Sequence, residues 1–221
     1  MPAETPAARR KVIMLGSTVI DIDTMLRVEG REFIKVVTGP VAKNMITAFF
    51  FQLSKINAGA SRPKGIEKNP TRKLGVLGAG MMGQGIAYVA AKVGIEVILK
   101  DMTQEAADKG KAYSEALVNK AVKRGKMFQS QADTLLGLIT PTANNEDLRG
   151  CDLIIEAVFE NIELKNKIIA NTEQYLSEDG FWGSNTSTLP ITELSLAASK
   201  PENFVGIHFF SPVDKMPLVE I

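Results

Sequence analysis

Short apolar runs alternate with helical patterns from Lys73 to the end of the chain. The runs are KLGVLG (73–78), GIEVILKD (94–101), CDLIIEAV (151–158), FWGSN (181–185) and FVGIHF (204–209). Continuous apolar strands separated by helices are typical of a parallel sheet that helices cover on both faces. The pattern therefore predicts an α/β fold, with a doubly wound, Rossmann-type parallel sheet over residues 73–221.

The long interval between the second and third runs predicts helices. The stretch TQEAADKGKAYSEALVNKAVKRGK, at 103–126, indicates a charged helix of roughly six turns at 3.6 residues each. SQAD, at 130–133, has the S-x-x-D form of a capping box and predicts a second helix from about Ser130. We therefore expect a helical hairpin inserted after the second strand.

Residues 1–57 are expected to form a helical arm, followed by a linker at 58–72. Pro40 suits the first position of a helix and Asn57 suits its end. Between them, apolar residues recur at three- and four-residue spacing, namely Val41, Met45, Ile46, Phe49, Phe50, Leu53 and Ile56. Phe51 widens this face, so the helix should pack against a partner on more than one side.

The composition excludes several classes of protein. Apolar and charged contents of 45% and 23% are those of a soluble globular protein. A single cysteine, Cys151, excludes a disulfide framework and a cysteine-ligated metal site, and we expect no metal. No run approaches 18 apolar residues, so no membrane span is expected. The start MPAETPAARRK shows no signal peptide, and we expect a cytoplasmic location.

The small net charge of +1 hides an uneven distribution along the chain. Residues 1–73 carry 13 Lys/Arg against 6 Asp/Glu, which is +7, and residues 74–221 carry 13 against 19, which is −6. A basic arm can indicate binding to nucleic acid. Because the charges are mixed and no nucleic-acid motif is present, we do not expect that partner.

A glycine-rich loop follows the first apolar run. Gly78, Gly80 and Gly83 form G-x-G-x-x-G between a strand and a helix, and Asp101 follows 18 residues after the last glycine. This pattern is typical of dinucleotide binding, with the phosphates at the helix N-terminus and the aspartate on a ribose diol. A 2′-phosphate would meet the negative charge of Asp101, so NAD is favoured over NADP. The alternative is a glycine-rich turn of another α/β protein.

The only histidine, His208, ends a predicted strand, where open parallel sheets place their sites. Oxidation of an alcohol by hydride transfer needs a base for the hydroxyl proton, and histidine is a common choice. PLVEI reads as an extended segment that could bring Glu220 back beside His208, where a carboxylate would orient the imidazole. From spacing alone, a histidine and a glutamate twelve residues apart are more often unrelated.

A cluster of small polar residues follows the fourth predicted strand. Ser184, Asn185, Thr186, Ser187 and Thr188 could bind ligand oxygens or a nicotinamide amide. They could equally cap the following helix.

Four stretches together resemble the L-3-hydroxyacyl-CoA dehydrogenase family. They are GVLGAGMMGQGIAYVAAKVGIEVILKD, DLIIEAVFENIELK, SNTSTLPITEL and GIHFFSPVDKMPLVEI, in order across residues 73–221. Within the family they are most similar to the α subunit of the multifunctional fatty-acid β-oxidation complex. The resemblance implies NAD-dependent oxidation of a (3S)-3-hydroxyacyl-CoA to a 3-ketoacyl-CoA.

The resemblance also implies roles for individual residues. His208 would be the catalytic base, Glu220 its partner, and Ser187 a contact to substrate and nicotinamide. The residues implied to bind NAD are Gly78, Gly80, Met82, Gly83, Asp101, Glu160, Asn161, Lys165, Ser187 and Ser211. Many members have asparagine where this chain has Ser211, which puts one cofactor contact in doubt. Ala116 stands near the place of a CoA-binding serine. Lys120 and Lys123 could meet CoA phosphates, although a solvated helix face is the simpler interpretation.

The arm resembles the tail and connecting helix that join an enoyl-CoA hydratase domain to the dehydrogenase. The hydratase body and the helical second dehydrogenase domain of the family lack counterparts in this sequence, so we expect a piece of a longer protein. Whether a thiolase subunit binds that protein stays open. The alternative hypothesis is a non-catalytic NAD-binding fragment whose arm docks a partner domain.

Overall fold

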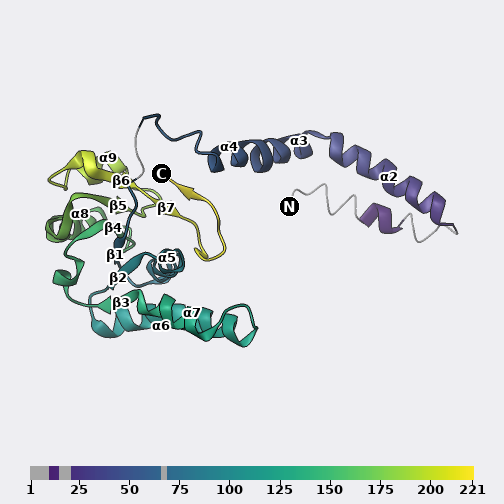
Figure 1. Ribbon diagram of the computed structural model, residues 1–221. Coiled ribbons are helices and arrows are strands. Elements are labelled where there is room, and N and C mark those ends of the chain that lie inside the picture. Colours follow the sequence, from purple (N-terminus) through teal and green to yellow (C-terminus); the bar gives the residue numbers. More distant parts are fainter. Residues whose placement is uncertain (1–9, 15–20, 66–68) are drawn as a thin grey trace. The chain divides into compact units, whose positions relative to one another are not determined.

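The chain forms two compact units, Met1–Lys68 and Asn69–Ile221, in a computed structural model that describes residues 10–14, 21–65 and 69–221 (Figure 1). The boundary falls inside the linker expected at 58–72. Residues 1–9 and 15–20 of the expected arm, and 66–68 of the linker, lie outside the described residues.

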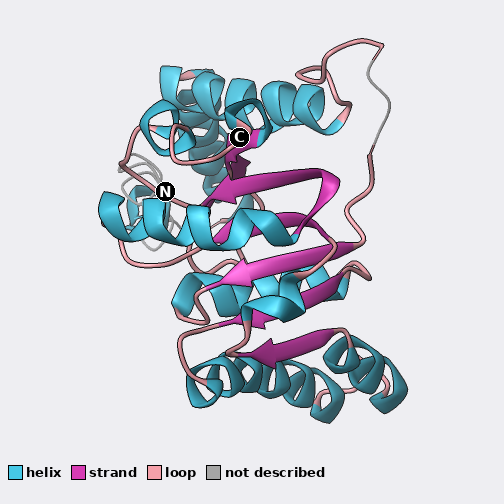
Figure 2. Cartoon of the chain, turned by 90° about the vertical axis from the view of Figure 1, so that its left-hand side faces the viewer, coloured by secondary structure: helices cyan, strands magenta, loops and turns pink. Residues whose placement is uncertain are grey.

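A six-stranded parallel sheet is the centre of the second unit. Its strands are β1 (Lys73–Leu77), β2 (Glu96–Lys100), β3 (Ile139–Thr142), β4 (Cys151–Glu156), β5 (Leu176–Ser184) and β6 (Phe204–Gly206). They lie in the order β3-β2-β1-β4-β5-β6, and every neighbouring pair is parallel (Figure 2). The order reverses between β1 and β4, and ligands of such sheets bind at the carboxyl ends beside that reversal. The predicted Rossmann-type sheet is confirmed.

Helices cover both faces of the sheet (Figure 1). One face carries α5 (Met81–Lys92), α6 (Gln104–Lys123) and α7 (Gln129–Gly137), and the other carries α8 (Ile162–Thr172) and α9 (Ile191–Ser195). Short 3-10 turns η2 (Asn145–Leu148), η3 (Glu173–Tyr175) and η4 (Pro201–Asn203) complete the connections. Two apolar clusters result, one around Ile86 and Leu99 and one around Trp182 and Ile154.

The sequence pattern missed one strand. β3 has only four residues, ITPT, and lies at the edge of the sheet, where it pairs with β2 alone. Proline lacks the N–H that a central strand needs, so Pro141 is tolerated there. Its short length and low apolar content explain why periodicity gave no signal.

The last predicted strand is divided in two. Phe204–Gly206 forms β6 of the main sheet, whereas β7 (His208–Phe209) pairs antiparallel with β8 (Val219–Glu220). Ile207 lies between them and donates its N–H to the carbonyl of Ser184 at 2.8 Å. The chain therefore leaves the sheet just before His208.

The inserted hairpin is present, with one boundary corrected. Thr103 caps α6 by accepting the N–H of Ala106 at 3.2 Å. The second helix, expected from about Ser130, is α7, which begins at Gln129; its N-cap is Phe128, whose N–H donates to the side chain of Gln131 at 3.0 Å. The SQAD capping box predicted from the sequence was therefore wrong.

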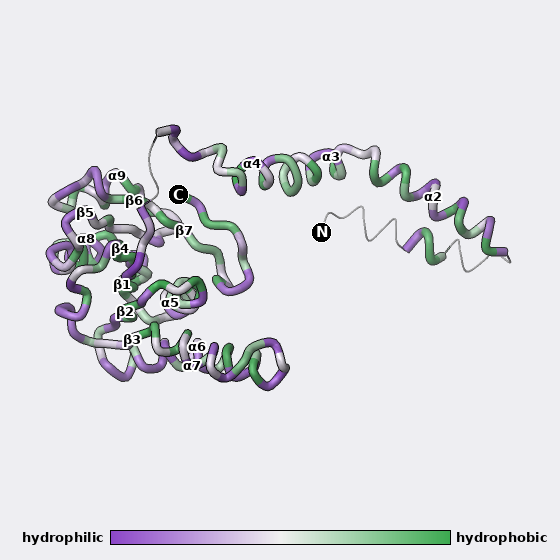
Figure 3. The backbone as a smooth tube through the Cα atoms, viewed as in Figure 1, coloured by the Kyte–Doolittle hydropathy of each residue, from purple (hydrophilic) through white to green (hydrophobic). Residues whose placement is uncertain are grey.

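The first unit is helical. α2 (Ile22–Thr38), which the sequence pattern did not predict, is followed by α3 (Pro40–Ile46), a π-helical turn η1 (Thr47–Gln52) and α4 (Leu53–Asn57). The helix predicted from Pro40 to Asn57 is therefore confirmed, with a π turn inside it. The hydropathy colouring shows an apolar stretch at this turn (Figure 3). Phe49, Phe50 and Phe51 there are 70%, 64% and 55% exposed. Among the described residues, no helix has the length and apolar character to cross a membrane.

We predict that Gly83→Ala destabilises the second unit. A Cβ at this position would lie 1.7 Å from the carbonyl oxygen of Gly78, so the glycine loop or α5 must move. Overpacking of this kind costs about 1–3 kcal/mol. Gly137→Ala is the matched control, because nothing lies within 4 Å of its added Cβ. Urea unfolding of both variants gives the comparison, and equal midpoints would contradict the prediction.

Candidate active site

His208 and Glu220 face each other across the two-stranded ladder. They are direct partners in the β7–β8 register, and Nδ1 of His208 lies 2.9 Å from Oε2 of Glu220. The imidazole is 26% exposed and the carboxylate 62% exposed. Because a carboxylate only accepts hydrogen bonds, the neutral imidazole carries its proton on Nδ1 in this pair. Nε2 then has a free lone pair, as a general base requires.

The polar cluster after β5 lies beside this ladder. Asn185 accepts the N–H of Phe209 through Oδ1 at 2.9 Å, which ties the cluster to β7. Ser184 aligns with Glu156 in the β4–β5 register, and both end their strands. The histidine pair and the cluster therefore meet at the carboxyl edge of the sheet.

Glu160 organises the loop at 186–188. Its Oε1 accepts the hydroxyl of Thr186 at 2.5 Å and the N–H groups of Ser187 and Thr188 at 2.9 and 3.1 Å. Ser187 itself is exposed. Thr186 also accepts the N–H of Leu189 at 3.0 Å, so it holds the turn that follows, whereas Ser187 is exposed. Ligand binding by the cluster stays a prediction.

Glu160 also belongs to a buried ion cluster with Lys165 and Glu156. Nζ of Lys165 lies 2.7 and 2.8 Å from the two carboxylate oxygens of Glu156 and 3.2 Å from Oε2 of Glu160. Lys165 and Glu156 are 1% and 0% exposed, and the buried Ser184 hydroxyl also donates to Glu156. Charges this deep persist only when they are paired. Sequence reasoning missed Glu156, although a carboxylate closing an apolar strand was a usable signal.

The surroundings of Glu160 lower its pKa. Burial alone would raise it, but the hydrogen bonds from Thr186, Ser187 and Thr188 and the charge of Lys165 outweigh burial and bring the pKa to about 2. Glu160 is therefore ionised at neutral pH and keeps accepting from the loop.

The glycine loop has the shape of a dinucleotide cradle. Gly78 has a φ of +94°, and an added Cβ would lie 2.8 Å from the carbonyl oxygen of Ala157. A Cβ at Gly80 would meet nothing within 4 Å, so space remains above the loop. The N-terminus of α5 has no side-chain cap at Gly80, which leaves its N–H groups for an anion.

Asp101 lies beside this cradle at the end of β2. Its Oδ2 accepts the N–H of Ala79 at 2.6 Å, and its Oδ1 accepts the N–H of Met102 at 2.7 Å. A cavity of about 120 Å³ opens between Asp101, Gly78, Val158 and Asn145. Oδ1 of Asn145 is a buried acceptor without a partner. An orphan acceptor beside the loop fits a nucleoside, and sequence reasoning missed it because η2 is a single short 3-10 turn without a sequence period.

The remaining residues that the family resemblance implies as NAD contacts already contact other groups of the protein. Asn161 caps α8, since its Oδ1 accepts the N–H of Leu164 at 2.8 Å. Met82 packs against the core, whereas the neighbouring Met81 is exposed and its sulfur accepts the hydroxyl of Ser211 at 3.8 Å. Lys165 is enclosed by its two carboxylates, so a direct contact is closed to it in this structure.

The candidate CoA residues lie on the inserted hairpin. Lys120 and Lys123 are exposed in the last turn of α6. Ala116 is exposed one turn earlier. The structure does not bring them into contact with the other site residues.

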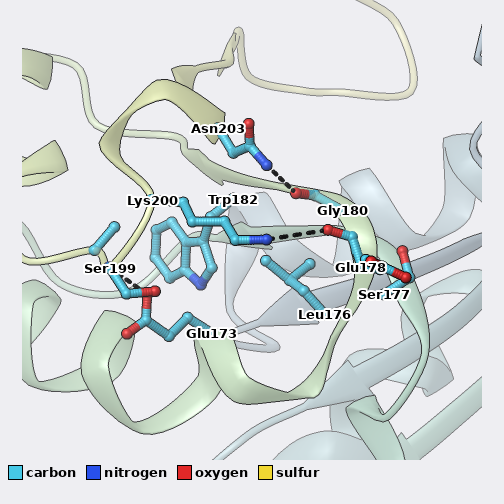
Figure 4. A pocket seen from close by; sticks show the side chains of 10 residues that line it. Glu173, Leu176, Ser177, Glu178, Gly180, Trp182, Ser199, Lys200 and Asn203 are labelled. Atoms are coloured by element: carbon cyan, nitrogen blue, oxygen red, sulfur yellow. Dashed lines mark hydrogen bonds between the residues drawn. The ribbon is translucent and has the colours of Figure 1, made fainter.

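A second cavity, of about 170 Å³, lies elsewhere in the sheet (Figure 4). Its walls include Leu176, Ser177 and Glu178 at the amino end of β5, together with Trp182 and Lys200. Nζ of Lys200 donates to the carbonyl of Glu178 across it. Sites of parallel sheets lie at the carboxyl ends, so this cavity is not the candidate site.

Comparison with known proteins assigns the second unit to a family. Residues 73–221 match the family model described as 3-hydroxyacyl-CoA dehydrogenase, NAD binding domain. The chain is 39% and 38% identical to fatty acid oxidation complex subunit alpha of Psychrobacter arcticus and of Acinetobacter baumannii, over 222 and 221 residues. These matches cover 100% of this chain and 30% of each relative, so the chain spans less than a third of their length.

Solved structures agree with this assignment. FadB2 of M. tuberculosis and (S)-3-hydroxybutyryl-CoA dehydrogenase PaaH1 of Ralstonia eutropha each share 36% identity with a TM-score of 0.65, covering 68% of this chain and 53% of theirs. The dehydrogenase part of multifunctional enzyme 1 from C. elegans shares 30% identity with a TM-score of 0.61, covering 70% and 35%. With the glycine cradle, the reversal between β1 and β4 and the family match all in residues 73–221, this chain belongs to the 3-hydroxyacyl-CoA dehydrogenase family and contains its NAD-binding domain.

Proposed function

We propose that the second unit is the NAD-binding half of an enzyme that oxidises (3S)-3-hydroxyacyl-CoA to 3-ketoacyl-CoA. The observation that carries the proposal is the 2.9 Å pair of His208 and Glu220, in register at the carboxyl edge of the sheet. A base held in this way suits removal of a hydroxyl proton.

Each residue of the candidate site is proposed to have a separate role in the reaction. Nε2 of His208 takes the hydroxyl proton, and Glu220 holds the Nδ1–H and stabilises the imidazolium that forms. Bound NAD⁺ supplies the hydride acceptor. Ser187, exposed on the loop that Glu160 holds, is proposed to orient the substrate oxygen and the nicotinamide amide. Lys165 acts through Glu160, because its ammonium neutralises the carboxylates beneath that loop.

Cofactor contacts are proposed for the residues around the cradle. Gly78 and Gly80 would let the pyrophosphate approach the N-terminus of α5, Gly83 lets the loop pack against that helix, and Asp101 would accept hydrogen bonds from the ribose. Contacts from Met82, Asn161 and Ser211 stay predictions. The same holds for CoA phosphates at Lys120 and Lys123.

We base our proposals about further domains, partners and location on the relatives of this chain. Those relatives are named subunits of a fatty acid oxidation complex, and this chain spans 30% of their length. We propose that the arm belongs to an enoyl-CoA hydratase domain and that a helical domain completes the acyl-CoA site. A thiolase partner and the cytoplasmic location stay predictions.

We predict that His208→Gln abolishes most dehydrogenase activity while leaving the cofactor bound. Loss of a general base costs about 10²–10⁴ in rate. Glu220→Gln should also lower the rate at neutral pH, because the amide lacks the charge that stabilises the imidazolium. The control is Glu178→Gln, at the other end of the sheet. Acetoacetyl-CoA reduction by NADH is the assay, with NADH titration for binding.

That assay is run on this chain and on a polypeptide that spans the full length of its relatives. Inactivity of both, with NADH bound, would favour the alternative of a non-catalytic cofactor-binding fragment. Activity that survives His208→Gln would remove the histidine from the mechanism.

We predict that Asp101→Ala weakens NADH binding by roughly 1–3 kcal/mol, because a charged acceptor of the ribose and of the Ala79 N–H is lost. Asp179→Ala, exposed in β5, is the control. Isothermal titration gives both affinities. Equal affinity of the unmodified chain for NADH and NADPH would contradict the role given to Asp101.

We predict that Glu160 contributes stability that acid removes. Its pKa is lowered in the folded chain from 4.5 to about 2, so the contribution is complete above about pH 5 and is lost as the pH falls toward 2. Glu160→Gln should therefore flatten the decline of the unfolding free energy between pH 5 and pH 2. Denaturant titrations across that range test it, and parallel curves for both proteins would refute it.

A further inference from the structure

The segment that joins His208 to Glu220 is anchored away from both residues. Residues 210–218 connect β7 to β8, and within them Asp214 accepts the phenol hydrogen of Tyr113 through Oδ1 at 2.9 Å. Tyr113 belongs to α6 of the inserted hairpin. The contact links positions 101 residues apart in the chain.

Val213, the residue before Asp214, anchors the 210–218 segment to the core. Val213 is buried in the core cluster against α5. A Cβ added to Gly85 would lie 2.8 Å from the Cβ of Val213, so Val213 can pack against α5 only because Gly85 has no side chain. Asp214 is thereby held near two phenols, Tyr88 of α5 and Tyr113 of α6. Burial first, and then Asp214, raises the pKa of both. Both are protonated at neutral pH, and Tyr113 is the one that donates.

The β7–β8 ladder is too short to be stable by itself. β7 and β8 have two residues each, and an isolated two-stranded hairpin is marginal in water. Ser211, Pro212, Lys215, Met216, Pro217 and Leu218 in the connecting segment are exposed. Phe209 of β7 packs on the core and donates its N–H to Asn185. Within the 210–218 segment, Ser211 makes a long contact to the Met81 sulfur at 3.8 Å, and the firmer attachments are the buried Val213 and the 2.9 Å bond of Asp214.

We propose that Tyr113 is a positioning residue of this site. By holding Asp214, it keeps the 210–218 segment on α5 and α6 and so keeps Glu220 in register with His208. The inference rests on the proposed function, because it takes His208 as the base. It also gives the inserted hairpin a role beyond covering the sheet, since α6 contributes directly to the geometry of the catalytic pair.

The single histidine makes the test specific. In ¹⁵N-labelled protein, the imidazole nitrogens report only His208, and their shifts show which nitrogen carries the proton. Tyr113→Phe should lower the population with the proton on Nδ1. It should also speed hydrogen exchange at residues 208–209 and 219–220 about tenfold, as expected for loss of a hydrogen bond to a charged group. Asp214→Ala should do the same, and Asp214→Asn, which keeps an acceptor oxygen, should restore most of the original signal.

Tyr175→Phe is the matched control. The phenol of Tyr175 also donates to a carboxylate, Oε1 of Glu146 at 3.1 Å, but lies in η3, outside the β7–β8 ladder and its connecting segment. It should leave the His208 signals and the exchange at β7 and β8 unchanged. If Tyr113→Phe changes them no more than Tyr175→Phe does, Tyr113 does not position the pair and the proposal is overturned.

A kinetic measurement separates this proposal from the proposed function. In the polypeptide that spans its relatives' length, Tyr113→Phe should lower kcat for acetoacetyl-CoA reduction about tenfold, with KM for NADH unchanged. A raised KM with unchanged kcat would overturn the positioning role. If the unmodified protein is inactive, the proposed function fails, while the NMR comparison still decides whether Tyr113 holds the pair.

Discussion

The buried ammonium of Lys165 is the constraint on which the site depends. It lies 2.7 Å from Glu156 at the end of β4 and 3.2 Å from Glu160 before α8, and the side chains of Lys165, Glu156 and Glu160 are 1%, 0% and 37% exposed. Unpaired, each would be costly to bury, so the pairing fixes the strand, the helix and the turn between them. Glu160 then has one oxygen left for the loop at 186–188, which places Ser187 at the surface. The conformation of this loop thus depends on the buried ion cluster through Glu160.

The strand order supplies the second element of the site. β1 and β4 are adjacent although the chain forms β2 and β3 between them, so the loops after β1 and β4 leave the sheet in different directions. The glycine cradle follows β1, and the ion cluster and polar loop follow β4 and β5. The histidine pair is added at the same edge because the chain leaves β6 at Ile207 and turns back through the 210–218 segment. Cofactor cradle and base therefore share one edge while resting on different supports.

Much of this site could be read from the residues. The glycine spacing, the aspartate after β2 and the apolar runs each have a local physical signature, and the structure places them as a strand–loop–helix unit. The roles of Glu156, Ser184 and Asn145 had no such signature, although Ser184 belonged to the polar cluster singled out in the sequence and Glu156 visibly closed an apolar strand. Their roles come from neighbours distant in sequence; Ser184, for example, donates to Glu156, 28 positions earlier in the chain. The edge strand β3 and the start of α7 were missed for a related reason, because sheet pairing and one glutamine side chain decided them.

The sequence by itself determined the fold class, the dinucleotide cradle and the candidate base, because backbone conformation and hydrophobic periodicity are local properties of consecutive residues. Only the tertiary structure decided which carboxylate serves which partner. It brought Glu220, which the sequence had only suggested as a partner, to His208; it assigned Glu160 to the loop and enclosed Lys165, for which the family resemblance had implied a ligand contact. It also brought Tyr113 to Asp214, a contact that no spacing could indicate. The physical reason is that a polar side chain has many available partners in an extended chain. Burial excludes water and leaves it only those that the packing of distant elements brings within hydrogen-bonding distance.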